Sequence, residues 1–290
     1  MIDGVLLLDK PVGPSSSAVL QAVRRLLNAR KAGHAGTLDP MASGLLPLLF
    51  GEATKFARFG LDAPKEYAAQ VRLGVSTDTG DAEGKVTARQ AVSVDDSQVA
   101  RVLERFRGEI YQVPPMYSAL KREGKPLYKI AREGRSVERA ARAVTVHELE
   151  LLGREQDVLH LRIRCSKGTY IRQIAADLGM ELGAGAHLAA LRRTAVGAYR
   201  LERAVTLEDL QAMAEKARRA WLLPAESLLE GLPRLELQDE EAERFLSGQG
   251  IEIAAPGGPC RVYRRAGPFL GIGKPAPGGR VQPLRLLARG

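Results

Sequence analysis

The segment GHAGTLDPMASGLLPLLFGEATKF, residues 33–56, presents a single carboxylate in a setting that suits chemistry. Asp39 stands between Leu38 and Pro40, and Gly36 lies close by. A turn stiffened by proline and flanked by glycine can present an acid as a nucleophile to a bulky substrate. An Asp before a Pro is also a common way to start a turn. Asp39 alone therefore fits a structural role as well, and a chemical role needs partners elsewhere in the chain.

Side chains that could serve such an acid are spread along the sequence. They are His34, Tyr67, Tyr170, Arg172 and Leu191. Each also has an ordinary structural interpretation, as a surface histidine, a half-buried aromatic, a solvated helix charge or a core leucine. A hydrolase with paired carboxylates would need a second acid, and the sequence singles none out near Asp39.

The composition points to a polyanionic partner. The chain has 43 Lys and Arg against 34 Asp and Glu, a formal charge of +9 and a sequence pI of about 9.7. Such an excess of positive charge favours nucleic acid or an anionic membrane surface. No apolar stretch approaches the roughly 18 residues of a membrane span, and no basic leader precedes an apolar region. We therefore expect a cytosolic protein that does not bind a membrane.

The usual signatures of cofactor and metal sites are missing from the sequence. It has no GxxxxGK[ST] phosphate loop, no GxSxG, no HExxH and no complete dinucleotide-binding loop. The acidic turn TDTGDAEGK, residues 77–85, departs from calcium-loop spacing. The two cysteines, Cys165 and Cys260, belong to no cluster with metal-ligand spacing. We expect a reaction that uses no metal and no organic cofactor.

Apolar periodicity indicates the elements that must position the candidate residues. A buried strand and then a serine-capped helix are expected within residues 4–29. Alternation predicts a strand from Glu66 onward, which carries Tyr67. A second alternating strand, residues 159–165, leads into a helix with Arg172 near its start.

The remaining segments indicate how the chain is divided. A capped helix is expected within residues 93–108, and another helix begins near Thr206. Between them, residues 109–142 form a basic, tyrosine-bearing excursion, which we expect to add affinity for a partner rather than chemistry. A boundary near Pro233 precedes a tail of one short helix and several Gly/Pro-punctuated strands.

Six blocks of the sequence resemble, in order, those of the bacterial tRNA pseudouridine-55 synthases, the TruB family. The blocks are DKPVGPSS, GHAGTLDPMASGLLPLLFGEATKF, KEYAAQVRLGVSTDTGDAEG, VPPMYSALKREGKPLYKIAREG, CSKGTYIRQIAADLG and GAHLAALRRTAVG. The resemblance covers residues 4 to about 200. The tail from about residue 233 is similar to the PUA-type RNA-binding module.

The resemblance implies an α+β fold. The catalytic domain, residues 1–232, would hold a mixed, largely antiparallel sheet flanked by helices, with a basic RNA-gripping insertion at about 109–142. A small C-terminal β-barrel, the PUA-like domain, would occupy residues 233–290. The implied enzyme is a cytoplasmic monomer that needs no cofactor. It would isomerise uridine to pseudouridine at position 55 in the T-loop of tRNA, gripping the T-arm and reaching the acceptor end through its C-terminal module.

The resemblance also assigns roles to single residues. Asp39 matches the catalytic nucleophile, Tyr67 packs on the target base and is a candidate proton acceptor, and Arg172 pairs with the catalytic carboxylate. Three further residues match positions that line the RNA or base pocket: His34, Tyr170 and Leu191. The sequence leaves open whether Asp39 attacks the sugar, attacks the base or drives a route through a glycal.

Two other functions are compatible with the same basic chain. One is a guide-RNA-dependent pseudouridine synthase of the same superfamily, and the insertion at 109–142 argues against it. The other is a non-catalytic RNA-binding or RNA-folding protein. Asp39 argues against that function, because binding to phosphates gains nothing from an acid.

Overall fold

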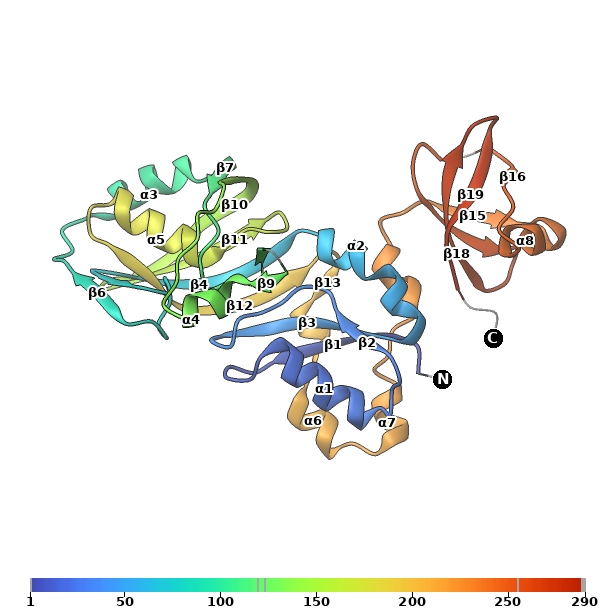
Figure 1. Ribbon diagram of the computed structural model, residues 1–290, viewed down its shortest axis with the longest axis horizontal. Helices are drawn as coiled ribbons and strands as arrows, with labels where there is room; N and C mark the ends of the chain where they lie inside the picture. Colours follow the sequence, from blue (N-terminus) through green and yellow to red (C-terminus); the bar gives the residue numbers. More distant parts are fainter. Residues whose placement is uncertain (1, 119, 123, 255, 288–290) are drawn as a thin grey trace.

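The chain forms two β-sheets that follow one another along an elongated molecule (Figure 1). The computed structural model describes residues 2–118, 120–122, 124–254 and 256–287. Within these ranges the larger sheet has ten strands and the smaller has five, and two short hairpins accompany them. None of the helices in the described ranges has the length and apolar character needed to cross a membrane.

The larger sheet runs in the order β14-β1-β3-β12-β4-β11-β10-β7, with β13 beside β12 and β2 beside β3. Its strands are β1 (Gly4–Lys10), β2 (Ala32–His34), β3 (Ala42–Phe50), β4 (Lys65–Leu73), β7 (Gly108–Gln112), β10 (Arg142–Glu155), β11 (Val158–Cys165), β12 (Ala186–Val196), β13 (Tyr199–Arg200) and β14 (Val205–Thr206). The pairs β1–β14 and β3–β12 are parallel and the other pairs are antiparallel. The predicted mixed, largely antiparallel sheet is confirmed.

Helices cover this sheet in separate groups. The α-helices of the larger unit are α1 (Ser16–Leu26), α2 (Ala57–Asp62), α3 (Asp96–Arg105), α4 (Leu127–Arg132), α5 (Ile171–Glu181), α6 (Leu207–Ala212) and α7 (Glu215–Arg219). Short 3-10 turns lie at η1 (Gly51–Phe56), η2 (Leu201–Arg203) and η3 (Ala225–Leu229). Helix α5 packs on β12 and β4, α3 packs on α5 and β10, and α1 packs on β3 beside α6.

The first and third strands are apolar on both faces because both faces are covered. Leu6 and Leu8 of β1 join the main core, which includes α1, whereas Val5 and Leu7 point into a second apolar cluster. Strand β3 divides its side chains between the two clusters in the same way. A strand buried on both faces reads as a continuous apolar run rather than an alternating one.

The second cluster joins the larger unit to the C-terminal module. That module is a curved sheet in the order β15-β17-β18-β19-β16, packed against α8 (Asp239–Leu246). Its strands are β15 (Arg234–Leu237), β16 (Ile251–Glu252), β17 (Cys260–Arg264), β18 (Phe269–Ala276) and β19 (Arg280–Leu286). The ring of Phe56 lies 5.7 Å from that of Phe269, and Lys55 donates to the carbonyl of Leu286 at 3.0 Å. Removing the module would therefore expose apolar surface of the larger unit.

The local elements expected from the sequence are present. Ser15 caps α1 through a hydrogen bond from the Ala18 amide at 3.2 Å, and α3 begins with the expected capping box. The prediction of one continuous helix from Thr206 is wrong. Met213 and Ala214 adopt extended conformations with ψ of 149° and 154°, and these residues separate α6 from α7.

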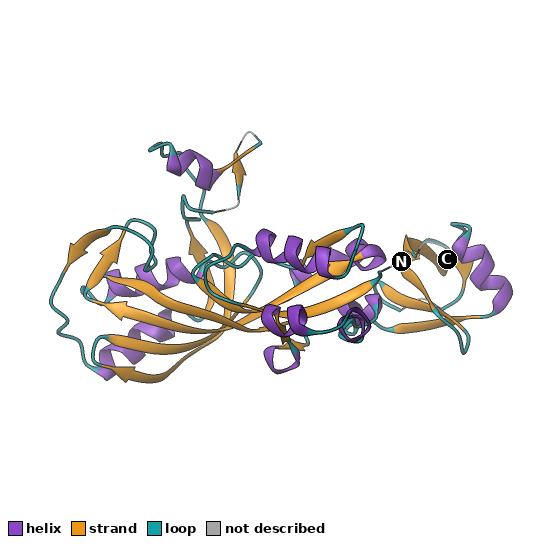
Figure 2. Ribbon diagram, turned by 90° about the horizontal axis from the view of Figure 1, so that it is seen from below, coloured by secondary structure: helices purple, strands orange, loops and turns teal. Residues whose placement is uncertain are grey.

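The basic excursion leaves the sheet after β7 and returns at β10. The strands β8 (Lys121–Arg122) and β9 (Lys125–Pro126) form a short hairpin that is followed by α4. Figure 2 shows this segment standing off the face of the larger sheet. The other short hairpin pairs β5 (Val75–Thr77) with β6 (Val86–Arg89).

The close approach of β3 to β12 gives a test of the parallel pairing. Gly44 has φ +100°, and a Cβ there would lie 2.3 Å from the Arg193 carbonyl oxygen. Gly13 has a similar φ of +109°, but no atom lies within 4 Å of its Cβ position. Backbone strain should cost Gly13→Ala about 1–3 kcal/mol of unfolding free energy. The added clash should cost Gly44→Ala about 2 kcal/mol more.

Urea denaturation of both variants measures this difference. Equal losses of stability in Gly44→Ala and Gly13→Ala would contradict the close pairing of β3 with β12.

Candidate active site

Five of the six residues expected at a site line one pocket in the larger unit. The pocket has a volume of about 350 Å³, and its lining includes Asp39, Tyr67, Tyr170, Arg172 and Leu191. These residues come from the loop before β3, from β4, from the start of α5 and from β12. The sheet therefore brings together segments that lie far apart in the sequence.

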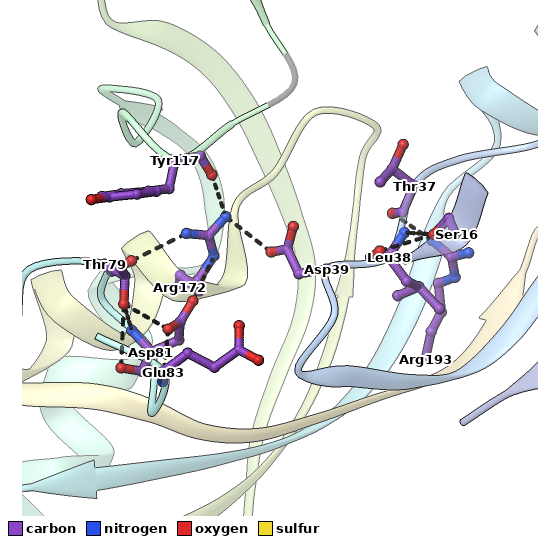
Figure 3. Close-up of polar contacts among 10 residues, drawn as sticks. All are labelled: Ser16, Thr37, Leu38, Asp39, Thr79, Asp81, Glu83, Tyr117, Arg172 and Arg193. Atoms are coloured by element: carbon purple, nitrogen blue, oxygen red, sulfur yellow. Dashed lines mark hydrogen bonds and ion pairs between the residues drawn. The ribbon is translucent and has the colours of Figure 1, made fainter. Parts of the chain in front are cut away.

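Buried polar side chains fix the loop that carries Asp39. The Ser16 hydroxyl accepts from the Leu38 amide at 2.8 Å and donates to the Leu38 carbonyl at 2.9 Å (Figure 3). The Lys10 ammonium donates to the Ala42 carbonyl at 2.7 Å on the other side of Asp39. Both side chains are fully buried. Their bonds hold the backbone on either side of the acid in one conformation.

Two buried lysines place positive charge close to the pocket. Burial lowers the pKa of Lys10 to about 8, although the charge of Asp39 opposes this shift. Burial also lowers the pKa of Lys65 to about 8. Lys65 donates to three carbonyls at the end of α2, at 2.6 to 3.1 Å. Carbonyl oxygens solvate both ammonium groups without cancelling their charge.

Arg172 gathers partners from three other segments. Its side chain is only 6% exposed, and its Nη2 lies 2.9 Å from Asp39 Oδ2 (Figure 3). Its Nε lies 3.5 Å from Asp81 Oδ2, and its Nη1 donates to the Thr79 carbonyl at 3.1 Å. Nη2 also donates to the Tyr117 carbonyl at 2.7 Å. A buried guanidinium with two carboxylates and two carbonyls is both neutralised and held in one orientation.

Asp39 is the exposed member of this group. Its side chain is 41% exposed, and Arg172 holds Oδ2. In the part of the chain that the structure describes, no hydrogen bond reaches Oδ1. One oxygen is therefore fixed while the other faces the pocket, as a nucleophilic carboxylate requires.

Strand pairing places the apolar wall of the pocket. Tyr67 on β4 is opposite Arg193 on β12, and Ala69 is opposite Leu191. Because cross-strand partners project to the same face, Tyr67, Leu191 and Arg193 lie together. Burial raises the pKa of Tyr67, while the charge of Arg193 acts in the opposite direction.

Tyr170 forms the wall next to Arg172. Its backbone N–H and C=O both bond to the Gln112 side chain, at 3.0 and 3.2 Å. Burial raises the pKa of Tyr170. The ring is thus held at the start of α5.

The basic excursion contributes directly to the pocket. Ser118 is buried and lines the pocket, and Leu120 lines it as well. The Tyr117 carbonyl shares Arg172 Nη2 with Asp39. The segment expected to supply affinity alone therefore also touches the ion pair.

His34 lies outside the lining of the pocket. It ends β2, where it pairs with Leu48 of β3. Burial lowers its pKa, and the charge of Arg193 lowers it further. Its Nδ1 is buried and makes no hydrogen bond within the described residues. A role for His34 in RNA binding stays a prediction.

Sequence reasoning missed several residues that support the site. Asp81 lies in the turn TDTGDAEGK, which the sequence suggested only as a poor match to a calcium loop. Lys10 follows the apolar run of the first strand and leaves its pattern unchanged, so it did not stand out. A lysine at the end of an apolar strand is nevertheless a signal for a buried polar contact. Ser16 and Arg193 become recognisable only once their partners are known. Among the described residues, no three His, Cys, Asp or Glu side chains are grouped so as to hold a metal ion.

The C-terminal and N-terminal parts of the chain both match family models. The TruB family pseudouridylate synthase N-terminal domain matches residues 24–171. The tRNA pseudouridylate synthase B C-terminal domain matches residues 172–230, and the Pseudouridine synthase II TruB C-terminal model matches residues 233–287.

Two solved structures of complexes contain a chain of similar fold. A Cbf5-Nop10-Gar1 complex matches with a TM-score of 0.76 and 28% identity, covering 98% of this chain and 85% of the other. An H/ACA RNP bound to a substrate RNA containing 2′-deoxyuridine matches with a TM-score of 0.75 and 26% identity, over 99% and 85%.

Curated relatives are more similar in sequence. The tRNA pseudouridine synthase B of Dechloromonas aromatica is 53% identical over 287 residues, which cover 99% of this chain and 96% of the relative. That of Aromatoleum aromaticum is 55% identical over 291 residues, covering 99% and 94%. The carboxylate pocket, the curved C-terminal module and these matches together lead to one conclusion: the chain belongs to the TruB family of pseudouridylate synthases.

Proposed function

We propose that this protein isomerises uridine to pseudouridine at position 55 in the T-loop of tRNA, without a guide RNA and without a cofactor. The observation that carries the proposal is Asp39, a half-exposed carboxylate that a buried Arg172 holds at 2.9 Å inside a pocket. Membership of the TruB family and the names of the relatives support the reaction and the tRNA substrate.

The pocket suits a single nucleoside. Its volume of about 350 Å³ falls at the lower end of the range for small-molecule sites, and it cannot admit a stacked helix. The target uridine therefore leaves the stack of the RNA loop, at a cost of about a few kcal/mol. Contacts with Tyr67 and Leu191 offset this cost, because a flipped base gains stacking and apolar contacts in its pocket.

The reaction itself needs a covalent handle and proton transfers. It breaks the N1–C1′ bond of uridine and forms a C5–C1′ bond, with no net gain or loss of atoms. The free Oδ1 of Asp39 serves as the handle. Arg172 orients the carboxylate through the ion pair, and Tyr67 is the proton acceptor beside the base.

A stand-alone enzyme is favoured over a guide-dependent one. The relatives named tRNA pseudouridine synthase B are more than half identical to this chain, whereas the protein of the Cbf5 complex is 28% identical. A non-catalytic RNA-binding protein is disfavoured, because an acid in the binding pocket repels phosphates.

The remaining surfaces hold the RNA. The basic segment at about 109–142 grips the T-arm, and the C-terminal module reaches the acceptor end. The enzyme works as a monomer in the cytoplasm, where its tRNA substrate is found. The net charge of +9 provides the attraction to phosphates.

The first prediction separates chemistry from binding at Asp39. Asp39→Asn keeps the size of the side chain but removes the nucleophile, so turnover should fall below detection while tRNA affinity stays near the unaltered value. The matched control is Asp62→Asn, since Asp62 is 40% exposed and lies 2.8 Å from Lys167 in a similar ion pair.

Tritium release from C5-tritiated tRNA and filter binding measure the two quantities. The nucleophile assignment fails if Asp39→Asn retains turnover close to that of Asp62→Asn.

The second prediction concerns the partners of Arg172. Arg172→Lys keeps the charge but loses the planar fork that serves four acceptors, so the single-turnover rate should fall about 100-fold. Asp81→Asn should lower the rate in the same direction, because Arg172 then keeps a single carboxylate. The double variant Asp39→Asn with Arg172→Lys should be no slower than Asp39→Asn, since nothing remains to be positioned.

Rates measured at saturating enzyme test this network, with melting temperatures as the control for folding. An Arg172→Lys rate within twofold of the unaltered enzyme would remove Arg172 from the chemistry.

The third prediction concerns recognition of whole tRNA. If the C-terminal module touches the acceptor end, KM should be higher for an isolated T-arm hairpin than for whole tRNA, with kcat little changed. Both KM values should rise steeply between about 50 and 200 mM salt, because phosphate contacts release counterions. Equal KM values for the two substrates would count against the acceptor-end contact, and a flat salt response would count against a phosphate-led interface.

A further inference from the structure

Arg193 is a buried cation that the roles assigned so far do not use. It is 1% exposed and heads the fully buried side chains by volume. Its guanidinium donates to the carbonyls of Leu45 at 2.7 Å, Gly36 at 3.1 Å and Thr37 at 3.4 Å. No carboxylate of the described chain lies within ion-pair distance of it. A buried charge without a counter-charge is costly, and such groups are concentrated at functional sites.

The sheet aims this cation at the pocket. Arg193 of β12 is paired with Gly44 of β3 on one side and with Tyr67 of β4 on the other. The missing side chain of Gly44 lets the strands approach closely at this row. The long arginine side chain extends under the loop of Asp39, where it donates to the carbonyls of Gly36 and Thr37, and it lines the same pocket as its cross-strand neighbour Tyr67.

Chemistry fixes how these two neighbouring groups can interact. A guanidinium has donors and no acceptor, so toward the Tyr67 oxygen Arg193 can only donate. The proton of the Tyr67 hydroxyl is then left for another acceptor, and Tyr67 lines the pocket. Arg193 thereby makes Tyr67 a donor toward whatever occupies the pocket.

We propose that Arg193 is a positioning residue for Tyr67: it directs the phenol proton to the uracil ring as the glycosidic bond breaks, and it stabilises the phenolate that remains. This inference rests on the proposed isomerisation of uridine. In this inference Tyr67 first donates its phenol proton to the uracil ring, and the resulting phenolate later accepts the proton from C5.

The proton transfers balance. As N1–C1′ breaks, its electron pair stays on N1 and Asp39 Oδ1 forms a bond to C1′, while the Tyr67 proton moves to N1 and leaves a phenolate beside Arg193. After rotation of the ring, the C5–C6 double bond supplies the pair for the new C5–C1′ bond, the O–C1′ pair returns to the Asp39 carboxylate, and N1 shares its lone pair with C6. The phenolate then removes the hydrogen from C5, and the C5–H pair restores the C5–C6 double bond. Tyr67 is neutral again, and pseudouridine carries the proton on N1.

The charges around Tyr67 and Arg193 support these roles. Three groups interact electrostatically with Tyr67: Arg193, Cys165 and Asp39. Three other cationic or titratable groups feel the charge of Arg193: Lys10, His34 and Lys65. Cys165 and Asp39 both raise the pKa of Tyr67, so Arg193 supplies the opposing influence.

A purely structural role for Arg193 predicts different behaviour. In that case Arg193 would only hold residues 36–37, and a neutral donor would replace it. Arg193→Gln keeps donors but removes the charge, whereas Arg193→Lys keeps the charge. Ser16→Ala loosens the same loop at Leu38 without touching Tyr67 and serves as the matched control.

The experiment measures single-turnover tritium release from C5-tritiated tRNA for the unaltered enzyme and these three variants. Each protein is prepared with tyrosine or with 3,5-difluorotyrosine at position 67, because the fluorinated phenol is more acidic and needs less help from a cation. Arg193→Lys should stay within about tenfold of the unaltered rate, and Arg193→Gln should be about 100-fold slower. Difluorotyrosine should speed Arg193→Gln at least about tenfold and leave Ser16→Ala unchanged.

Two outcomes would overturn the proposal. One is an Arg193→Gln rate equal to that of the unaltered enzyme, and the other is failure of difluorotyrosine to speed Arg193→Gln. If the unaltered enzyme releases no tritium, the proposed function fails instead.

An NMR titration with 13C-labelled tyrosine, assigned with Tyr67→Phe, then tests the inference about Arg193 by itself. The pKa of Tyr67 must be higher in Arg193→Gln than in the unaltered protein, and equal pKa values refute the inference.

Discussion

The guanidinium of Arg172 is the point on which the arrangement of the site depends. Its planar, fixed donors meet Asp39, Asp81, the Thr79 carbonyl and the Tyr117 carbonyl, which belong to segments far apart in sequence. Taking this charge out of water is costly, and only partners that all reach it together offset the cost. The start of α5, the loop before β3, the turn after β5 and the basic excursion are therefore constrained by one side chain. Because Arg172 is buried and Asp39 is half exposed, the guanidinium stays fixed while the carboxylate remains accessible.

The contact with Tyr117 links the basic excursion to the ion pair. Arg172 Nη2 serves both the Tyr117 carbonyl and Asp39, so a displacement of the basic excursion changes the hydrogen bonding of the nitrogen that orients the acid. A sequence-based division of the chain into gripping and reacting segments does not include this contact, because it runs through a backbone carbonyl. Backbone contacts leave no signature in residue identity. The basic excursion and the Asp39–Arg172 pair are best treated as one physical unit.

Local sequence determined much of the fold and of the site. Periodicity and capping located β1, α1, β4, β11 and α5. The blocks that resemble the TruB family selected Asp39 and Arg172 before any geometry was known. The central strand β12 was not predicted, because AHLAALRRTAV shows neither strict alternation nor a continuous apolar run. Arg193 is buried only because β3 and β4 enclose it, and this enclosure is a property of strand order rather than of local sequence. Asp81 was missed for the same reason, since an acidic turn reveals no partner until α5 is placed beside it.

Three buried cations occupy positions that apolar residues could fill with less cost to stability. The electrostatic potential that they create beneath the pocket explains their presence. Lys10, Lys65 and Arg193 are solvated by carbonyl oxygens rather than neutralised by carboxylates, so a positive potential remains beneath the pocket. Cleavage of the glycosidic bond places negative charge on the uracil ring, where such a preorganised potential stabilises it most. The two lysines have pKa values of about 8 and can lose their protons near neutral pH. Arginine cannot lose its charge in this range, even where burial lowers its pKa. The residue paired with Tyr67 is therefore the one whose positive charge does not depend on pH.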